Sequence, residues 1–181
     1  MFAMPVDEDL ELRLLEHRHA KLLFDLTVAN REHLRPYLPW VPKMQAVSQT
    51  ESFIKLGLEQ FARHDGFQAG VFLSGELVGM AGLHYVRWDT LRTELGYWLA
   101  ESAQGQGVAT RVVGALCSYC FGELGLGRVE IRCAPENIRS RRVPERLGFT
   151  QEGVLRRVDR LESGWSDWVV YGLLRDEWKG R

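Results

Sequence analysis

The sequence predicts an α/β (α+β) fold in which a mixed, mostly antiparallel central sheet is flanked by helices on both faces. Residues 70–83 form two apolar runs around a Ser74-Gly75 turn, a pattern typical of an antiparallel hairpin. Residues 151–174 have the pattern of a second, closing hairpin. Between the two, residues 93–133 alternate strand, helix and strand, which indicates a parallel crossover. Antiparallel hairpins around one parallel unit give a mixed sheet.

The remaining elements follow from the spacing of their apolar residues. Residues 10–14 alternate apolar and polar side chains, as a half-buried strand does, and residues 18–35 and 47–63 have helical spacing. The central unit and the segment after it divide into a strand at 93–100, a helix at about 106–123, a strand at 128–133 and a helix ending near Leu147-Gly148-Phe149. The chain thus opens with a strand and helices, and then alternates strands and helices.

The length and composition indicate one globular domain. A chain of 181 residues is long enough to bury a core but short for two domains, so we expect a single domain over residues 1–181 with a core at about 8–176. The hydrophobic fraction of 45% and the charged fraction of 26% are ordinary for a globular protein. A net charge of -1 provides no overall attraction to nucleic acid or to an anionic membrane, so we expect neither as a partner.

Hydropathy and cysteine content predict a cytoplasmic protein. No apolar run approaches the roughly 20 residues that cross a bilayer, and residues 1–10 are acidic where a secretory signal would be basic and then apolar. Three cysteines are an odd number, which argues against a disulfide framework. Cys117 and Cys120 lie three residues apart in a helical pattern without a second pair, which favours packing over metal binding. We therefore expect reduced cysteines and no metal.

A glycine-rich turn joins the predicted strand at 93–100 to the helix after it, and this turn reads Gln104-Gly105-Gln106-Gly107-Val108-Ala109-Thr110. The free N–H groups and partial positive charge at a helix start suit a diphosphate without any metal. Thr110 stands where a Rossmann fingerprint needs its third glycine, and no Gly-Lys-Ser/Thr follows to make a P-loop. A glycine-rich connection that binds no ligand remains the plain alternative.

Further motifs accompany this turn and together form a recognisable pattern. They are Glu94-Leu95-Gly96-Tyr97-Trp98-Leu99, Asn137-x-x-Ser140, Leu147-Gly148-Phe149, Glu152-Gly153-x-Leu155-Arg156 and Asp167-x-x-x-Tyr171. With these motifs the chain resembles the GNAT acetyltransferases from residue 10 almost to its C-terminus. Within that superfamily it is similar to the branch that contains the Rim-type ribosomal-protein N-terminal acetyltransferases.

The resemblance implies acetyl-CoA as cosubstrate, no metal, and a set of residues that bind the cosubstrate. Backbone groups near Trp98 and Leu99 would bond the pantetheine arm and polarise the thioester carbonyl as an oxyanion hole. Residues 104–110 would hold the pyrophosphate, and Asn137 would touch the pantetheine. Arg142, with its neighbour Arg141, could meet the ribose phosphate. In such folds the central strand separates from its parallel neighbour after a bulge, and the cofactor occupies the gap.

Direct transfer of an acetyl group needs a neutral amine, a stabilised oxyanion and a proton donor for the thiolate. By the resemblance, Ser140 matches the serine proposed as general acid, and Asp159 stands where the Rim-type branch often has a glutamate base. Because aspartate is one methylene shorter than glutamate, it could act through a water relay. The competing interpretation of Asp159 is a surface carboxylate paired with neighbouring arginines. Glu94, on the central strand, is the other candidate base. Ser140 has an alternative structural role, since a serine at a helix start commonly satisfies backbone donors.

The acceptor is a primary amine whose identity the sequence leaves open. An α-amine with a pKa of about 7.7–8.0 is partly neutral at pH 7, whereas a lysine near 10.4 needs a stronger base. This difference favours a protein N-terminus, with a polyamine or an antibiotic as alternatives. Tyr37 and Trp40, in a loop with three prolines, are candidate acceptor contacts, with ordinary core packing as the alternative. Tyr171 is either a core residue or a further acceptor contact.

Three further expectations stay open from the sequence. A non-catalytic module that only binds acyl-CoA is a second class of function, and association into a homodimer is allowed. Cys133 would end the strand beside the cofactor gap, where it is either an inert thiol or the site of a mixed disulfide with CoA. Pro144 cannot donate a hydrogen bond to the carbonyl of Ser140, so the helix there starts late or is distorted.

Overall fold

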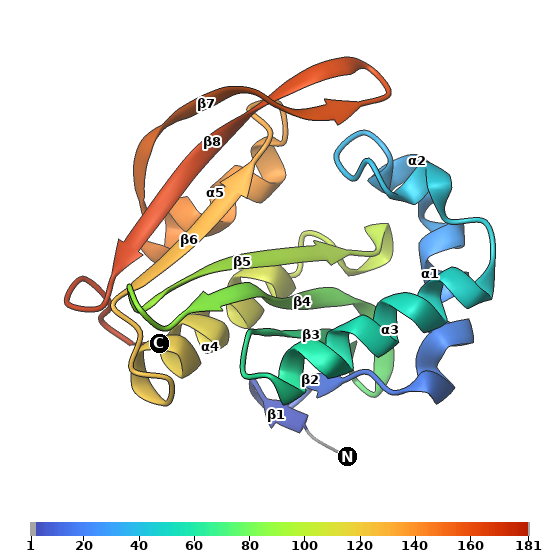
Figure 1. Ribbon diagram of the computed structural model, residues 1–181, viewed down its shortest axis with the longest axis horizontal. Helices are drawn as coiled ribbons and strands as arrows, with labels where there is room; N and C mark the ends of the chain where they lie inside the picture. The colour runs from blue at the N-terminus through green and yellow to red at the C-terminus, as the bar shows by residue number, and fades with distance from the viewer. Residues whose placement is uncertain (1–2, 181) are drawn as a thin grey trace.

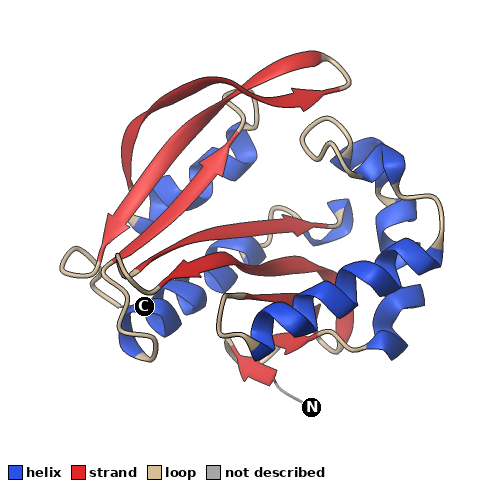
Figure 2. Ribbon diagram, in the orientation of Figure 1, coloured by secondary structure: helices blue, strands red, loops and turns tan. Residues whose placement is uncertain are grey.

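The computed structural model describes residues 3–180, and its elements are shown in Figures 1 and 2. The strands are β1 (Ala3–Pro5), β2 (Leu10–Leu14), β3 (Phe67–Leu73), β4 (Glu76–Arg87), β5 (Arg92–Leu99), β6 (Arg128–Cys133), β7 (Thr150–Leu161) and β8 (Gly164–Leu174). The α-helices are α1 (Ala20–Ala29), α2 (Arg31–Leu34), α3 (Val47–Ala62), α4 (Val108–Gly122) and α5 (Ile138–Leu147). Short 3-10 helices are η1 (His17–His19), η2 (Val41–Lys43) and η3 (Glu101–Ala103).

All eight strands form one sheet in the order β1-β2-β3-β4-β5-β6-β8-β7. Every neighbouring pair is antiparallel except β5 and β6, which are parallel and are connected through α4. The predicted fold class, a mixed and mostly antiparallel sheet flanked by helices, is therefore confirmed. Both predicted hairpins are present as β3–β4 and β7–β8. The first turns through Ser74 (φ 49°) and Gly75 (φ 84°), two positive φ values that suit a two-residue hairpin loop.

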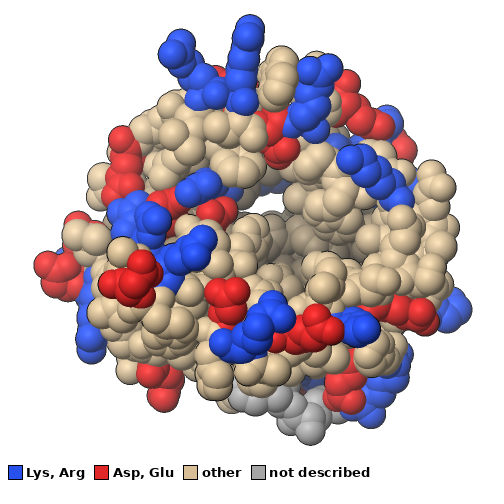
Figure 3. Space-filling model, viewed as in Figure 1, with Lys and Arg blue, Asp and Glu red and all other residues tan. Residues whose placement is uncertain are grey.

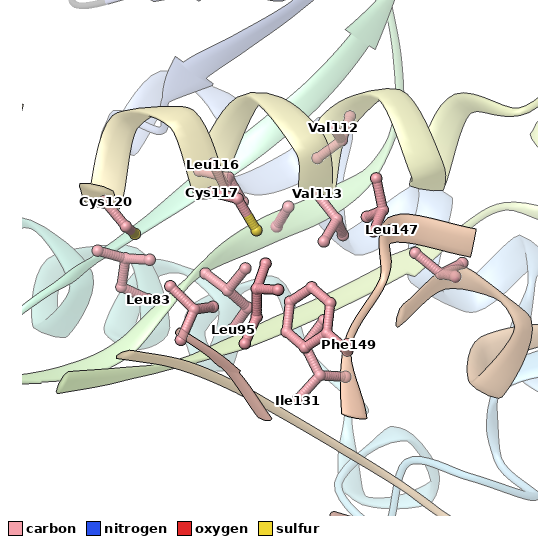
Figure 4. Close-up of a cluster of buried hydrophobic side chains, with 14 of the residues drawn as sticks. Leu83, Leu95, Val112, Val113, Leu116, Cys117, Cys120, Ile131, Leu147 and Phe149 are labelled. Atoms are coloured by element: carbon pink, nitrogen blue, oxygen red, sulfur yellow. The ribbon is translucent and has the colours of Figure 1, made fainter. Parts of the chain in front are cut away.

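Helices cover both faces of the sheet, but they do not cover them equally (Figure 1). On one face α4 packs through Val112, Val113 and Leu116 onto a cluster that includes Leu95 and Ile131 (Figure 4). On the other face α1 and α3 bury a second cluster over β3 and β4, with Leu23, Ile54, Phe72 and Met80 among its members. The part of this second face formed by β5, β6 and β8 has no helix over it. That part is where polar side chains of the sheet face outward.

Two predicted helices differ from the structure at their boundaries. The helix expected over residues 18–35 is interrupted at Asn30, whose side-chain amide donates to the carbonyl of Leu26 at 2.9 Å. The carboxamide oxygen of Asn30 accepts the N–H of Glu101 at 2.9 Å, so a tertiary contact stabilises the break. The helix expected from about residue 106 begins at Val108, because Gly107 precedes it in the left-handed conformation. The short strand β1 was not predicted.

Core packing of α4 gives the first testable expectation. Leu116 is 0% exposed, whereas Leu56 on α3 is 63% exposed. Leu116→Ala is expected to lower the free energy of unfolding by about 2–5 kcal/mol, because it removes buried methyl groups and leaves a cavity. Leu56→Ala should change it by less than about 0.5 kcal/mol. Urea unfolding followed by circular dichroism measures both, and equal losses in the two variants would contradict this packing.

Candidate active site

The site begins where strands β5 and β6 separate. Their parallel pairing covers residues 92–95 of β5 and ends at Leu95, opposite Ile131, although both strands continue. Beyond that point β5 stays paired with β4, and β6 stays paired with β8. The edge of β5 over residues 96–99 is therefore free on its β6 side. Figure 3 shows the molecule hollowed at this place, between β5 below and the β7–β8 hairpin above.

A helix start lies at one end of this cleft. Gly105 and Gly107 both have φ 76°, and Gly107 is the N-cap residue of α4 without a side-chain cap. The N–H of Arg111 bonds to the carbonyl of Gly107, the N-cap residue, so the N–H groups of Val108, Ala109 and Thr110 precede the first helical bond. Unpaired N–H groups at a helix start are a binding site for an anion such as a pyrophosphate.

Gln104 connects the two sides of the cleft. Its carboxamide nitrogen lies 2.6 Å from Nε2 of His33 on α2. Its carboxamide oxygen accepts a hydrogen bond from Arg139 on α5 at 2.5 Å. The carboxamide nitrogen of Gln104 is a donor, so in this contact His33 Nε2 accepts the hydrogen bond. His33 and Arg139 were not predicted as site residues. No sequence pattern joins them to Gln104, because they lie 71 and 35 residues away.

Ser140 lies on the first turn of α5 and contacts Tyr97 of β5. Its N–H donates to the side-chain oxygen of Asn137, the N-cap residue, at 3.1 Å. The hydroxyl of Tyr97 lies 3.2 Å from the hydroxyl of Ser140 and donates to the Ser140 carbonyl at 3.0 Å. Burial raises the pKa of Tyr97. The structure thus brings Asn137 and Ser140 together and adds Tyr97, to which the sequence assigned no role.

Pro144 explains why Tyr97 reaches the Ser140 carbonyl. The proline lies inside α5 and has no N–H, so it cannot occupy that carbonyl with a helical bond. The helix does not start late, since α5 runs from Ile138 to Leu147 through the proline, but the helical bond to the Ser140 carbonyl is missing. Cys133, at the end of β6, is buried nearby, and burial raises the pKa of its thiol to about 11. A proton is therefore held firmly on the sulfur at neutral pH.

The two candidate bases occupy different environments. Asp159 lies beyond an irregular stretch of β7 and accepts the backbone N–H of Arg160 at 2.8 Å. Within residues 3–180 it forms no hydrogen bond with Ser140 or Tyr97, and it takes part in no salt bridge. Glu94 is buried at the closed end of the cleft, with His84 Nδ1 and Arg132 Nε each 3.5 Å from one of its oxygens. Only Glu94 has charged partners at the point where β5 and β6 separate.

The predicted acceptor contacts fall in two groups. Trp40 packs against Trp98 of β5 with ring centroids 6.4 Å apart, and both Trp40 and Tyr37 are partly exposed beside the cleft. Tyr171 is 1% exposed, and its hydroxyl donates to Glu145 at 2.8 Å and accepts from Arg141 at 3.0 Å. Both hydrogen-bond partners belong to α5. Tyr171 is therefore a core residue that supports α5, the first of its two expected roles, and it offers no exposed surface to an acceptor.

The loop that carries Tyr37 and Trp40 lies opposite the β7–β8 hairpin. Arg35, at the end of α2, contacts Glu162 in the hairpin turn at 3.3 Å, and this exposed ion pair crosses the opening. Arg142 is exposed on α5 and Leu99 is buried at the end of β5. Within the part of the chain that is described, no group of three or more His, Cys, Asp or Glu side chains could hold a metal ion. None of the described helices is long and apolar enough to cross a membrane.

Comparisons with known proteins agree with this geometry. Residues 9–150 match the family model for the acetyltransferase (GNAT) domain. The chain is 36% identical over 181 residues to YdaF of Bacillus subtilis, covering 99% of both chains. It is 29% identical to the ribosomal-protein-serine acetyltransferase of Escherichia coli over 94% of this chain and 96% of that one.

Solved structures show the same similarity. The structure of RimL, a ribosomal L7/L12 α-N-protein acetyltransferase in complex with coenzyme A, superposes with a TM-score of 0.93 at 26% identity, covering 97% of this chain and 99% of that one. RimJ of Mycobacterium smegmatis, in complex with CoA-disulfide, has a TM-score of 0.87 at 28% identity and covers 93% of this chain and 83% of that one. The chain therefore belongs to the GNAT acetyltransferase family and is an N-acetyltransferase with acetyl-CoA as its cosubstrate.

Proposed function

We propose that this enzyme acetylates the N-terminal α-amine of a protein by direct transfer from acetyl-CoA lying in the cleft between β5 and β6. The observation that carries the proposal is the separation of β5 from β6 after Leu95, with an uncapped helix start at one end of the gap. Relatives that modify ribosomal proteins at an N-terminal serine or alanine support this acceptor class. The three free cysteines, all buried, fit the cytoplasm as the compartment.

In this proposal the donor lies along the free edge of β5. The N–H groups of Val108, Ala109 and Thr110, together with Gln104 and the flexible backbone at Gly105, Gln106 and Gly107, bind the pyrophosphate. The pantetheine amides pair with β5 near Trp98 and Leu99, in place of the missing strand. The oxygen of Asn137 accepts from Ser140, so we assign its amide nitrogen to the same arm. Arg142 is placed for the ribose phosphate.

In this proposal, groups on both sides of the gap carry out the steps of acetyl transfer. Ser140, with Tyr97 beside its hydroxyl, supplies the proton for the departing thiolate. Backbone N–H groups near Trp98 and Leu99 stabilise the oxyanion. Glu94 drives removal of the amine proton from the closed end of the cleft. Tyr37 and Trp40 line the approach of the acceptor, at the open side opposite the donor.

The acceptor class is tested by measuring free thiol release from acetyl-CoA with a panel of peptides, polyamines and aminoglycosides. We expect turnover with peptides that have a free α-amine, and none when that amine is blocked by formylation. Peptides with only a lysine amine are expected to react at least tenfold more slowly, because that amine is mostly protonated at pH 7. Turnover of polyamines or aminoglycosides alone would replace the protein acceptor with a small-molecule amine. Association into a homodimer remains a prediction that sedimentation velocity can measure.

The pyrophosphate site is tested at Gly107. Gly107→Ala is expected to raise the Kd of CoA about 5- to 30-fold, because a residue with a Cβ pays about 1–2 kcal/mol to hold φ 76°. Gly122→Ala, at the other end of α4, is the matched control, since Gly122 has no positive φ and open space around it. Isothermal titration calorimetry measures both. Unchanged affinity in Gly107→Ala would remove this turn from the cosubstrate site.

The choice between the two carboxylates is tested by comparing Glu94→Gln with Asp159→Asn. We expect Glu94→Gln to lower kcat by about 10²-fold or more, the usual range for losing proton-transfer assistance. Asp159→Asn should stay within about threefold, since Asp159 contacts only its neighbour's backbone among the site's described groups. Steady-state kinetics with a saturating peptide measures both variants. The opposite ranking would make Asp159 the base, as in the other interpretation of the sequence.

A further inference from the structure

His84 lies at the closed end of the cleft, and none of the roles above uses it. The pairing of β4 with β5 shifts register between Leu83 and Tyr85, so His84 is the bulged residue of β4. A bulge turns one side chain away from the regular alternation of the strand. The His84 side chain is 51% exposed, in contrast to Glu94, whose side chain is 10% exposed. Of these two groups, the imidazole is the more accessible to a molecule in the cleft.

The imidazole occupies the space over Gly96. A Cβ atom added to Gly96 would lie 1.9 Å from His84 Nε2 and less than 3 Å from two ring carbons. Gly96 is the first residue of β5 beyond the segment that pairs with β6. His84 Nε2 therefore lies over the residue where the two strands separate. The absence of a side chain at position 96 makes room for the ring there.

Charged residues lie beside the other ring nitrogen of His84, Nδ1. His84 Nδ1 lies 3.5 Å from one oxygen of Glu94, and Arg132 Nε lies 3.5 Å from the other oxygen. Arg132 itself donates to Glu130 at 2.6 Å, and its guanidinium lies 5.6 Å from the ring centre of Trp168. Glu94 thus lies between the imidazole of His84 and the guanidinium of Arg132. Among the described residues, none forms a hydrogen bond with Nε2 of His84.

We propose that His84 is the catalytic base, with Nε2 accepting the proton of the acceptor ammonium and Glu94 stabilising the imidazolium that forms. The proposal rests on the acetyl transfer proposed above and deepens it, because it moves the contact with the amine from the buried carboxylate to the exposed ring. A carboxylate beside a histidine favours the charged ring and orients it, as in other acid–base sites. Glu94 is then a positioning residue, which agrees with its burial.

The protons and bonds balance in this scheme. The ammonium gives one proton to His84 Nε2, and the neutral amine attacks the thioester carbonyl to form the new C–N bond. Collapse of the oxyanion breaks the C–S bond, and the thiolate takes a proton from the Ser140 hydroxyl, which is replaced by the second proton leaving nitrogen. His84 releases its proton to water. The products are the amide, the CoA thiol and one proton in solution.

The first experiment compares His84→Ala with His17→Ala, an exposed histidine of η1 remote from the cleft in sequence and structure. We expect His84→Ala to lower kcat at least 10²-fold with the KM for acetyl-CoA within twofold, and added imidazole to restore part of that rate. His17→Ala should match the parent enzyme with and without imidazole. Activity of His84→Ala within threefold of the parent, or a loss that imidazole does not restore, would overturn the role.

The second experiment keeps the histidine and displaces it. Gly96→Ala places a methyl group in the space of the imidazole, so the ring must move while the fold is retained, because the side chain is free to rotate. We expect kcat to fall at least tenfold with an unchanged Tm. In the His84→Ala background the same change should cost less than twofold, since there is no ring to displace. Additive losses, or a raised KM for acetyl-CoA, would instead indicate a clash with the cosubstrate.

These readouts separate the two proposals. Both experiments use an amine that the parent enzyme acetylates. If that amine is a small molecule, the proposal of a protein N-terminus as acceptor is wrong, but the test of His84 still stands. Imidazole rescue with a small-molecule amine would support His84 alone. A peptide acceptor turned over equally well by His84→Ala would support the acceptor class and refute His84.

Discussion

Strands β5 and β6 stop pairing after Leu95 and Ile131 although both continue, and this separation determines the geometry of the site. Unpaired backbone groups away from water are costly, so such a gap persists only where each strand is secured on its other side. Here β4 pairs with β5 to its end, and β8 pairs with β6 over its whole length. The free edge of β5 can then be satisfied by the amides of an extended ligand.

Polar contacts cross the gap from several elements and link its two sides. Tyr97 of β5 reaches Ser140 of α5, and Pro144 makes this contact available by leaving the Ser140 carbonyl without a helical donor. Gln104 joins α2 to α5, and Arg35 reaches the β7–β8 turn. The ion pair of Arg35 is exposed, and exposed pairs contribute little stability. The opening can therefore yield to a ligand, while the buried Tyr97 contact stays fixed.

The uncovered face of β5, β6 and β8 has a different electrostatic character. Its ion pairs run from Glu152 through Arg128, Glu130 and Arg132 to Glu94, and the signs alternate along the row. Buried carboxylates need such partners, because an unpaired charge away from water is strongly unfavourable. The row ends at Glu94, where the two strands separate and His84 stands beside its carboxylate.

The sequence by itself determined the hairpins, the strand-helix-strand unit and the glycine-rich turn, because these depend on local hydrophobic spacing and on residues with special φ values. It also indicated the family through motifs near Glu94, Gln104 and Ser140. Only the tertiary structure decided which distant side chains meet. Contacts such as His33 with Gln104 and His84 with Gly96 join separate elements, and no local pattern encodes their distances. The same packing buried Tyr171 and placed Tyr97 against Ser140, since the position of a strand in the sheet, not its sequence, decides what each side chain faces.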